Sequence, residues 1–339
     1  MVEALTSRQL PEPAGWFAVA ASGHLDRHGV LPANVGGHEL VVWRAERGQA
    51  KVAGAFCPHL GAHLGKVGST GDGQLRCGFH GFAFDSDGQC VSTGYGGRVP
   101  SRACLQMWPA AELDGVVLAW RHPQNDTPGW TIPAAATDGW TRPRWRTSSF
   151  AGHPLEITEN SVDLGHLRVL HGYEELRETS RASCEGPLLT ASYSFERPGR
   201  LAWPPAPDLR ASIEVSVHGL GFSRVELHVE TLGARLRLWV LPTSTGPGRV
   251  TLRLGVAANE SWAGDAPPAL RRIPAALVAP LLREFTLAGL AADVDQDRKV
   301  WRSKRHLLRP ALAPGDGPVG LYRHWAQQFL PAPTGNQRP

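Results

Sequence analysis

The sequence lacks the segments that direct a chain into or across a membrane. Its first residues, MVEALTSRQLPEPAGW, contain the acidic Glu3 and Glu12 and no apolar core of a signal peptide. It has no run of 18 or more uncharged apolar residues, which argues against a membrane span. We therefore expect a cytoplasmic protein with no membrane span.

The net charge is small and the cysteines are few. A formal net charge of +4 on 339 residues is too small and too dispersed to indicate a nucleic-acid partner. An odd number of cysteines in a chain without a secretory signal argues against a disulfide framework. No Gly-x-Gly-x-x-Gly follows a predicted strand, so we expect no dinucleotide site in this chain. The five cysteines are Cys57, Cys77, Cys90, Cys104 and Cys184.

Turn signals and apolar runs divide the chain into two domains. Residues 15–122 alternate short strand-like runs with tight turns, which predicts an all-β domain. Residues 123–143 are rich in Pro, Asp, Thr and Gly and are predicted to be a linker. Residues 144–330 combine alternating stretches with an Ala/Leu-rich helix predicted from Leu281 to about Leu308. The pattern indicates an α+β fold in which the second domain curves an antiparallel sheet around that helix.

The first metal motif is Cys57-Pro-His59, followed after seventeen residues by Cys77-Gly-Phe-His80. Each short loop offers one thiolate and one imidazole. Such a set suits a 2Fe–2S cluster with two cysteines on one iron and two histidines on the other. A structural zinc site is the alternative, because two cysteines and two histidines also bind zinc. The mixed pairs are unusual for zinc, which favours the cluster.

A second pair of histidines, His166 and His171, follows Asn160 and Asp163. Two histidines five apart do not share one face of a straight helix, because five residues turn it by about 500°. A widened turn, or a helix that ends near His171, would bring both rings to one metal. The alternative is a structural role for both, with His166 in the core and His171 at a helix end.

A metal site with two histidines can be completed by a carboxylate, a set of three ligands that leaves coordination positions open. The predicted helix offers Asp293, Asp295 and Asp297. Asp297 recurs with Val294 and Trp301 at helical spacing, on an apolar stripe where a carboxylate is unfavourable unless it binds a cation. Asp295 points elsewhere, whereas Asp293 lies one turn before Asp297 and stays a rival. A salt bridge to an arginine is the alternative role for either rival.

These motifs resemble those of the Rieske non-haem iron oxygenases. The cluster motif is followed by His80-Gly81-Phe82, close to the family's pattern, and the run from Asn160 to His171 resembles the Asn-x-x-Asp-x-x-His-x4-His motif of its catalytic domain. The tail, with Asp316-Gly317-Pro318 and Arg323-His324-Trp325, is similar to that of ketosteroid hydroxylases and cholesterol desaturases. The resemblance covers nearly the whole chain.

The resemblance implies a Rieske domain at residues 15–122, a helix-grip catalytic domain at 144–330, and a homotrimer. By that resemblance Asp163 links an iron-binding histidine to a Rieske histidine of the neighbouring subunit. Because Asp163 precedes His166 by one helical turn, we expect its carboxylate to accept the ring N–H that His166 does not use for iron. Asn160 lies beside the ligands, where it can touch substrate. The implied cluster ligands are Cys57, His59, Cys77 and His80, and the implied ligands of a mononuclear Fe(II) are His166, His171 and Asp297.

The implied activity is that of a terminal oxygenase. It would hydroxylate an apolar polycyclic or steroid-like molecule with O2 and two electrons, releasing water. Because the chain shows no nicotinamide motif, a ferredoxin, a flavin-dependent NAD(P)H reductase or both must supply the electrons. Alternatives on the same scaffold are desaturation and the oxidative tailoring of natural products. A pure Rieske electron carrier, or a degenerate oxygenase that only binds, would belong to a different functional class.

Overall fold

The computed structural model describes residues 4–124, 126–199 and 208–331, and the chain forms two compact units. The N-terminal unit comprises Ala14–Ala134 with Thr243–Gly246. The C-terminal unit comprises Met1–Pro13, Ala135–Pro242 and Pro247–Pro339. The division between Ala134 and Ala135 falls inside the stretch 123–143 that the sequence predicts to be a linker.

Both ends of that stretch pack against a unit. In the N-terminal unit, Nε1 of Trp16 donates a hydrogen bond to the carbonyl of Trp130 at 2.9 Å. In the C-terminal unit, Arg237 donates to the carbonyl of Ala136 at 2.7 Å and lies over the ring of Trp140, 4.2 Å from its centroid. Trp130 therefore belongs to one unit and Trp140 to the other.

The described residues of the N-terminal unit form three antiparallel sheets, two short α-helices and a 3-10 turn at Glu46–Gly48, in agreement with the predicted all-β domain. Strand β4 (His38–Arg44) is buried on both faces because alternate side chains of a strand point to opposite sides. Leu40 and Val42 pack toward β2 and β12, whereas Val41 and Trp43 pack toward the two cysteine loops. The strand orders are β10-β5-β4-β3, β11-β12-β2 and β6-β7-β8-β9. The bounds are β2 Gly15–Ala21, α1 Ser22–His28, β3 Val30–Val35, β5 Ala50–Gly54, α2 Leu64–Val67, β6 Ser69–Gly71, β7 Gln74–Arg76, β8 Ala83–Phe84, β9 Cys90–Ser92, β10 Met107–Trp108, β11 Ala110–Leu113 and β12 Val116–Arg121.

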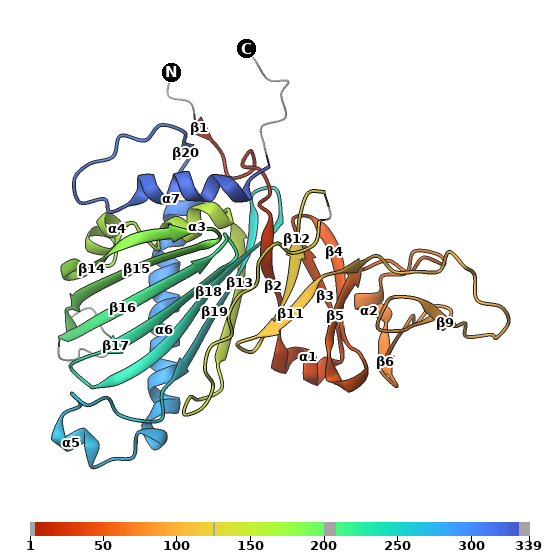
Figure 1. Cartoon of the computed structure of the whole chain (residues 1–339), viewed down its shortest axis with the longest axis horizontal. Helices are drawn as coiled ribbons and strands as arrows, with labels where there is room; N and C mark the ends of the chain where they lie inside the picture. The colour runs from red at the N-terminus through yellow and green to blue at the C-terminus, as the bar shows by residue number, and fades with distance from the viewer. Residues whose placement is uncertain (1–3, 125, 200–207, 332–339) are drawn as a thin grey trace. The chain divides into compact units, whose positions relative to one another are not determined.

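The C-terminal unit is a seven-stranded sheet that curves around one long helix, α6 (Figure 1). Apolar residues of α6 meet the inward residues of β13, β18 and β19 in one core, where Trp301 stacks on Phe150 at 5.8 Å. This arrangement confirms the predicted helix-grip fold. The strand order is β13-β19-β18-β17-β16-β15-β14. The bounds are β13 Arg144–Ala151, β14 Glu174–Glu185, β15 Leu188–Arg197, β16 Leu209–His218, β17 Phe222–Val229, β18 Ala234–Gly246 and β19 Arg249–Ala258.

Helix α6 spans Ala275–Trp301, so the predicted bounds of Leu281 to about Leu308 are wrong at both ends. Pro280 lies inside the helix, near its start. A proline there forgoes one backbone hydrogen bond, and the helix continues through it. Beyond Trp301 the chain leaves the helix because His306–Leu307 forms strand β20, which pairs with β1 (Ala4–Leu5).

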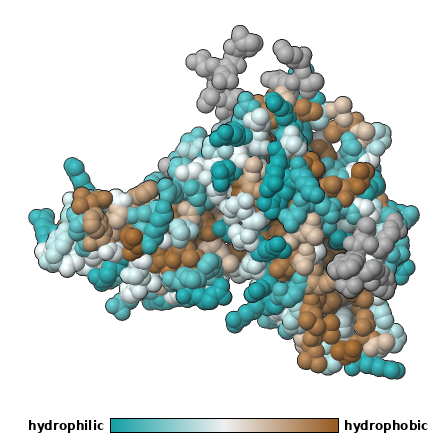
Figure 2. Space-filling view, turned by 180° about the vertical axis from the view of Figure 1, so that it is seen from behind, coloured by the Kyte–Doolittle hydropathy of each residue, from teal (hydrophilic) through white to brown (hydrophobic). Residues whose placement is uncertain are grey.

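The N-terminal half of α6 leaves an apolar face uncovered. Leu277, Leu281 and Phe285 follow one another at four-residue intervals and are 71 %, 71 % and 55 % exposed. Figure 2 shows apolar residues gathered at this part of the C-terminal unit, at its lower right. The helix is long and apolar enough to cross a membrane, a test that core helices of globular proteins also pass. Since Leu287 and Ala291 on its other face lie in the sheet's core, α6 has the pattern of a core helix with one open side.

Candidate functional site

The two cysteine loops of the N-terminal unit have the same backbone hydrogen bonds. Each cysteine N–H donates to the carbonyl five residues later, and each cysteine carbonyl accepts from the glycine four residues later. The pairs, at 2.8–2.9 Å, are Cys57–Ala62 and Gly61–Cys57 in one loop and Cys77–Phe82 and Gly81–Cys77 in the other. Both glycines have positive φ, 75° and 68°, a conformation that favours glycine. The loops therefore present their cysteines in equivalent local frames.

In these loops the two thiols lie together and the two imidazoles lie together. Cys57 and Cys77 are buried together, and the rings of His59 and His80 lie 4.7 Å apart. Phe82 stacks on His59 at 4.3 Å and limits the ring's rotation. Burial raises the pKa of Cys57 to about 11, with a further contribution from the Cys77 thiol, so metal binding there would displace a proton. Among the described residues, the buried Nδ1 of His80 has no hydrogen-bond partner, and a metal would satisfy it. The set fits a 2Fe–2S cluster.

In the C-terminal unit, the helix expected before His171 is two short helices, α3 (Pro154–Glu159) and α4 (Leu164–Val169). The N–H groups of Leu170 and His171 both donate to the carbonyl of His166, at 2.8 and 3.4 Å. The turn thus widens as the helix ends, which is one of the two ways the sequence offered of bringing both rings to one metal. The rings of His166 and His171 lie 5.0 Å apart, inclined at 76°.

Helix α6 brings Asp297 to these two histidines. Its Oδ1 lies 3.4 Å from Nε2 of His171 and 3.9 Å from Nε2 of His166, and one donor atom from each of the three residues lies within 4.8 Å of the others. The other two aspartates of the helix are engaged elsewhere. Asp293 forms a two-bond ion pair with Arg197, and Asp295 pairs with Arg298. Two imidazoles and one carboxylate with nothing else in the set fit a facial-triad iron site.

The pKa values of the two histidines are shifted in opposite directions. Burial lowers the pKa of His166, although the charges of Asp297 and Asp163 oppose that shift. A lowered pKa favours the neutral ring, which is the form that binds a metal. At His171 burial acts in the same direction but is outweighed by Asp297, so the pKa is raised. The carboxylate is thus coupled more strongly to His171 than to His166.

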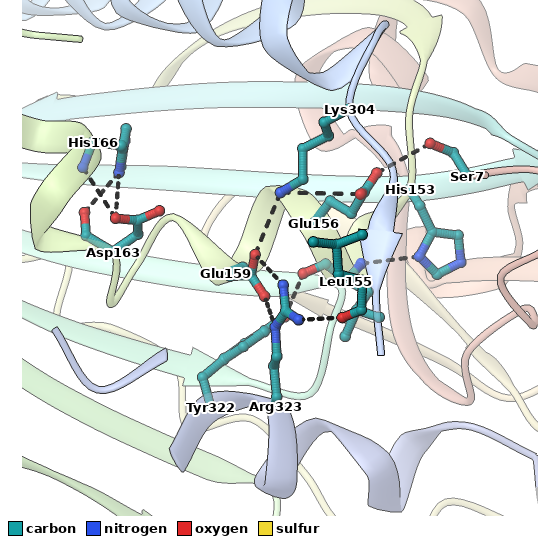
Figure 3. Close-up of polar contacts among 11 residues, drawn as sticks. Ser7, His153, Leu155, Glu156, Glu159, Asp163, His166, Lys304, Tyr322 and Arg323 are labelled. Carbon is teal, nitrogen blue, oxygen red and sulfur yellow. Dashed lines mark hydrogen bonds and ion pairs between the residues drawn. The ribbon is translucent and has the colours of Figure 1, made fainter. Parts of the chain in front are cut away.

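Asp163 does not hold the ring of His166 with its carboxylate, so that part of the prediction is wrong. Nδ1 of His166 lies 2.7 Å from the backbone carbonyl of Asp163, and 3.9 Å from its Oδ1. The carboxylate instead caps α4, its Oδ1 accepting the backbone N–H of His166 at 3.0 Å (Figure 3). Asp163 precedes the helix in extended conformation rather than lying one turn down it, which points its carbonyl at the ring.

Asn160 lies half-buried at the end of α3, in the turn that leads to Asp163. Its neighbour Glu159 is 4 % exposed and accepts hydrogen bonds from Arg323 at 2.6 and 3.1 Å and from Lys304 at 3.3 Å (Figure 3). One turn earlier, the fully buried Glu156 accepts a bond from Ser7 at 3.0 Å. The sequence analysis did not predict this cluster of buried ion pairs. The two signals available were the three-residue spacing of Glu156 and Glu159 just before the histidine motif, and Arg323 in the tail.

The tail also braces α4 directly. The carbonyl of Asp316 accepts the N–H of Leu164 at 3.0 Å, and Arg168 donates to the carbonyl of Gly315 at 3.1 Å. The tail residues singled out in the sequence therefore hold the helix that carries His166.

Two family models match the chain. Residues 15–103 match the Rieske [2Fe-2S] domain, and residues 119–330 match the 3-ketosteroid 9alpha-hydroxylase C-terminal domain. This chain belongs to the Rieske non-haem iron oxygenases. As an oxidoreductase of that family it uses a 2Fe–2S cluster and a mononuclear iron, which decides against zinc at the cysteine loops. Rieske oxygenases use O2 and take their electrons from a ferredoxin or a reductase.

Relatives of this Rieske oxygenase act on sterols and steroids by name. It is 28 % identical to a cholesterol 7-desaturase of Bombyx mori, over 94 % of this chain and 70 % of the relative. It is 26 % identical to a probable 3-ketosteroid-9-alpha-monooxygenase oxygenase component of Rhodococcus rhodochrous, over 86 % of this chain and 73 % of the relative.

Solved structures share the fold of this Rieske oxygenase. NdmA of Pseudomonas putida CBB5 with caffeine superposes with a TM-score of 0.69 at 16 % identity, covering 92 % of this chain and 89 % of that one. Dicamba monooxygenase bound to dicamba gives a TM-score of 0.64 at 19 % identity, covering 96 % and 98 %. At these identities the likeness establishes the architecture alone.

Proposed function

We propose that this chain is a monooxygenase that hydroxylates an apolar, steroid-like substrate at an Fe(II) held by His166, His171 and Asp297. The observation that carries the proposal is the convergence of these three donors in the C-terminal unit, separate from the Cys/His loops. A pure electron carrier would need no such second donor set. The bound iron would supply O2 binding and activation at the positions that its three ligands leave open.

The chain's own residues have distinct parts in this proposal. Cys57, Cys77, His59 and His80 hold the cluster that receives the electrons. The carbonyl of Asp163 keeps the proton of His166 on Nδ1, which leaves Nε2 free to ligate. Asn160, in the turn beside the ligands, would contact substrate.

We further propose that the carboxylate of Asp163 bridges to His80 or His59 of a neighbouring subunit in a homotrimer. One of its oxygens caps α4, and its side chain is 32 % exposed, so the other oxygen can accept a bond from outside the subunit. A head-to-tail contact of this kind closes into a ring.

Replacing Asp163 by Asn tests the bridge. Asn keeps the helix cap through its side-chain oxygen but removes the charge and replaces the second acceptor by a donor. We expect both metals to be retained, the cluster to be reduced normally by dithionite, and product formation to fall by more than about tenfold. Stopped-flow oxidation of the reduced cluster with substrate and O2 is the measurement. Oxidation at the parent rate, or a monomer in solution, would refute the bridge.

The relatives include both a desaturase and a monooxygenase, so either reaction is compatible with this fold. The reaction we favour, R–H + O2 + two electrons + two protons giving R–OH + H2O, inserts one oxygen atom. Removal of a second hydrogen from the same substrate would be desaturation. We place the enzyme in the cytoplasm, with a ferredoxin or a flavin-dependent NAD(P)H reductase as electron donor.

The decisive experiment incubates the protein with such a donor, O2 and a panel of sterols, 3-ketosteroids and polycyclic metabolites. A hydroxylase gives one labelled oxygen atom in the product from 18O2, and a desaturase gives none. An electron carrier shows no substrate-dependent O2 uptake. Absence of uptake across the panel from a protein with both metals filled would point to a different substrate class.

A further inference from the structure

A second buried carboxylate lies close to the proposed iron site. Asp293 precedes Asp297 by four residues on α6, and residues so spaced are neighbours on a helix, with Cβ atoms about 5–6 Å apart. The two aspartates are 8 % and 7 % exposed. Tyr173, whose hydroxyl approaches Asp293, has its ring 6.1 Å from the ring of His171. In this structure the oxygens of Asp293 are not among the donor atoms that lie within 4.8 Å of one another, so Asp293 stands beside the site without belonging to it.

Three contacts keep this carboxylate occupied. The guanidinium of Arg197, at the end of β15, donates to Oδ1 at 2.9 Å and to Oδ2 at 3.1 Å. The hydroxyl of Tyr173 approaches Oδ2 at 3.4 Å. The partners support one another, because Arg197 lies 5.5 Å above the Tyr173 ring, which stacks on Phe195 at 4.5 Å. A planar fork that engages both oxygens is the arrangement that best immobilises a carboxylate.

A tie between β15 and α6 is the simpler role for this ion pair. A buried ion pair, however, is a poor source of stability, since well-packed apolar residues in its place are often as stabilising or more so. The specific effect of the Arg197–Asp293 pair is that both carboxylate oxygens of Asp293 accept hydrogen bonds and are not available to a metal. A triad with one carboxylate leaves coordination positions open, whereas a second carboxylate would fill one and add a negative charge.

We propose that Arg197 is a positioning residue of the mononuclear site, which binds Asp293 so that Asp297 alone supplies a carboxylate to the metal. This inference rests on the proposed function, because it requires a metal at His166, His171 and Asp297. Arg197 touches neither substrate nor metal. It determines how many ligands the metal has and how many positions stay free.

The test loads Co(II) into chelator-treated protein and reads its ligands by X-ray absorption at the cobalt edge, to which the cluster's iron does not contribute. Affinity is measured by competition with a chelator. Arg197→Met has a similar length without charge and frees both oxygens of Asp293. We expect one more oxygen ligand and binding tighter by on the order of tenfold. Arg197→Met/Asp293→Asn is the matched control and should return both values to those of the parent.

If Arg197→Met does not fold, Arg197→Lys serves the same purpose. A lysine keeps the charge but lacks the fork, so it leaves one oxygen of Asp293 free. We expect a shift in the same direction and of smaller size. Unchanged Co(II) ligands and affinity in the folded variant, with only a loss of stability, would overturn the proposal and leave a structural tie. Parent protein that binds Co(II) without two imidazoles would instead overturn the iron site itself.

Discussion

The two metal sites of this chain are built in opposite ways. In the N-terminal unit, two loops within one short stretch repeat the same hydrogen bonds around Cys57 and Cys77, and each loop carries its own histidine. In the C-terminal unit, His166 lies in α4, His171 follows the end of that helix, and Asp297 comes from a helix distant in the sequence. The first site is made by local backbone geometry, whereas packing and ion pairs between distant segments make the second.

The difference has an energetic consequence. The cysteine loops are held by hydrogen bonds within each loop, so their geometry persists as long as those local bonds do. Two ion pairs between distant segments lie beside the mononuclear site, Glu159 with Arg323 and Asp293 with Arg197. Removing one partner leaves the other charge to find a new one. We therefore expect distant substitutions to alter the second site, in its stability or in its ligands, and to spare the first.

The largest effect tests the independence of the two sites. Cys57→Ala removes one of the two thiolates, so we expect loss of the visible cluster spectrum and of about two irons and two sulfides per chain. The mononuclear iron should remain, because its donors lie in the other unit. Metal and sulfide analysis measures both. Cys104→Ala, at an exposed cysteine, is the control and should keep both sites. A Cys57→Ala protein that still holds the cluster would refute the ligand assignment.

The converse substitution is Asp297→Ala. It removes the carboxylate that lies within 3.4 Å of His171 and 3.9 Å of His166, so the mononuclear iron should be lost and the cluster spectrum kept. Asp295→Ala, on the same helix but facing Arg298, should leave both metals in place. If Asp295→Ala or Asp293→Ala loses the iron while Asp297→Ala keeps it, the third iron ligand is that other aspartate and not Asp297.

The same contrast explains what the sequence alone could predict. The cluster motif is contiguous, so its four donors were identified from spacing. Helical spacing on an apolar stripe narrows the third ligand to Asp297 or Asp293, and the family resemblance favours Asp297. The pairing of Arg197 with Asp293 joins positions 96 apart, and that of Arg323 with Glu159 joins positions 164 apart. No periodicity in the sequence links such partners, because many arginines could meet either carboxylate.

Local geometry accounts for the remaining errors. The sequence gives no sign that Asp163 stands before α4 rather than within it, and that one-residue distinction moved its carboxylate from the ring to the backbone of His166. The predicted helix begins at Leu281, directly after Pro280, whereas α6 begins at Ala275 and continues through that proline. Boundaries of helices depend on tertiary packing as well as on propensity.

A smaller effect is expected when the tail's ion pair is broken. Arg323→Gln leaves the buried charge of Glu159 with Lys304, at 3.3 Å, as its remaining partner, so the cost should lie below the roughly 3–5 kcal/mol of a buried charge left without any partner. We expect the C-terminal unit to unfold at lower denaturant while the cluster absorbance persists. Glu159→Gln/Arg323→Gln removes both charges and should recover much of the loss, and Arg309→Gln, at an exposed arginine, should change little. Cluster loss in parallel with unfolding of the C-terminal unit would show that the units are not independent.

The last effect is absent at neutral pH and appears only on acidification: a pH dependence of the stability of the C-terminal unit. His153 and His306 are 1 % and 7 % exposed, and burial lowers the pKa of each from 6.5 to about 4. Between these values the unfolded chain binds protons that the folded chain does not, so this contribution to stability is complete above pH 6.5 and is lost as the pH falls toward 4. At about 1.4 kcal/mol per pKa unit, the loss is about 3 kcal/mol for each histidine.

Two substitutions separate this effect from the titration of carboxylates. Nδ1 of His153 accepts the N–H of Leu155 at the start of α3, so His153→Asn keeps an acceptor at the cap without a titrating ring. His306→Leu removes a buried ring whose Nδ1 has no partner among the described residues. Unfolding free energies at pH 7, 5 and 4 should fall less steeply in each variant than in the parent. Most carboxylates protonate below pH 4.5, but burial raises the pKa of Glu156 above its usual value, so only the part of the fall between pH 7 and 5 that a histidine substitution removes belongs to that histidine. Curves parallel to the parent's over that interval would remove the histidines as the cause.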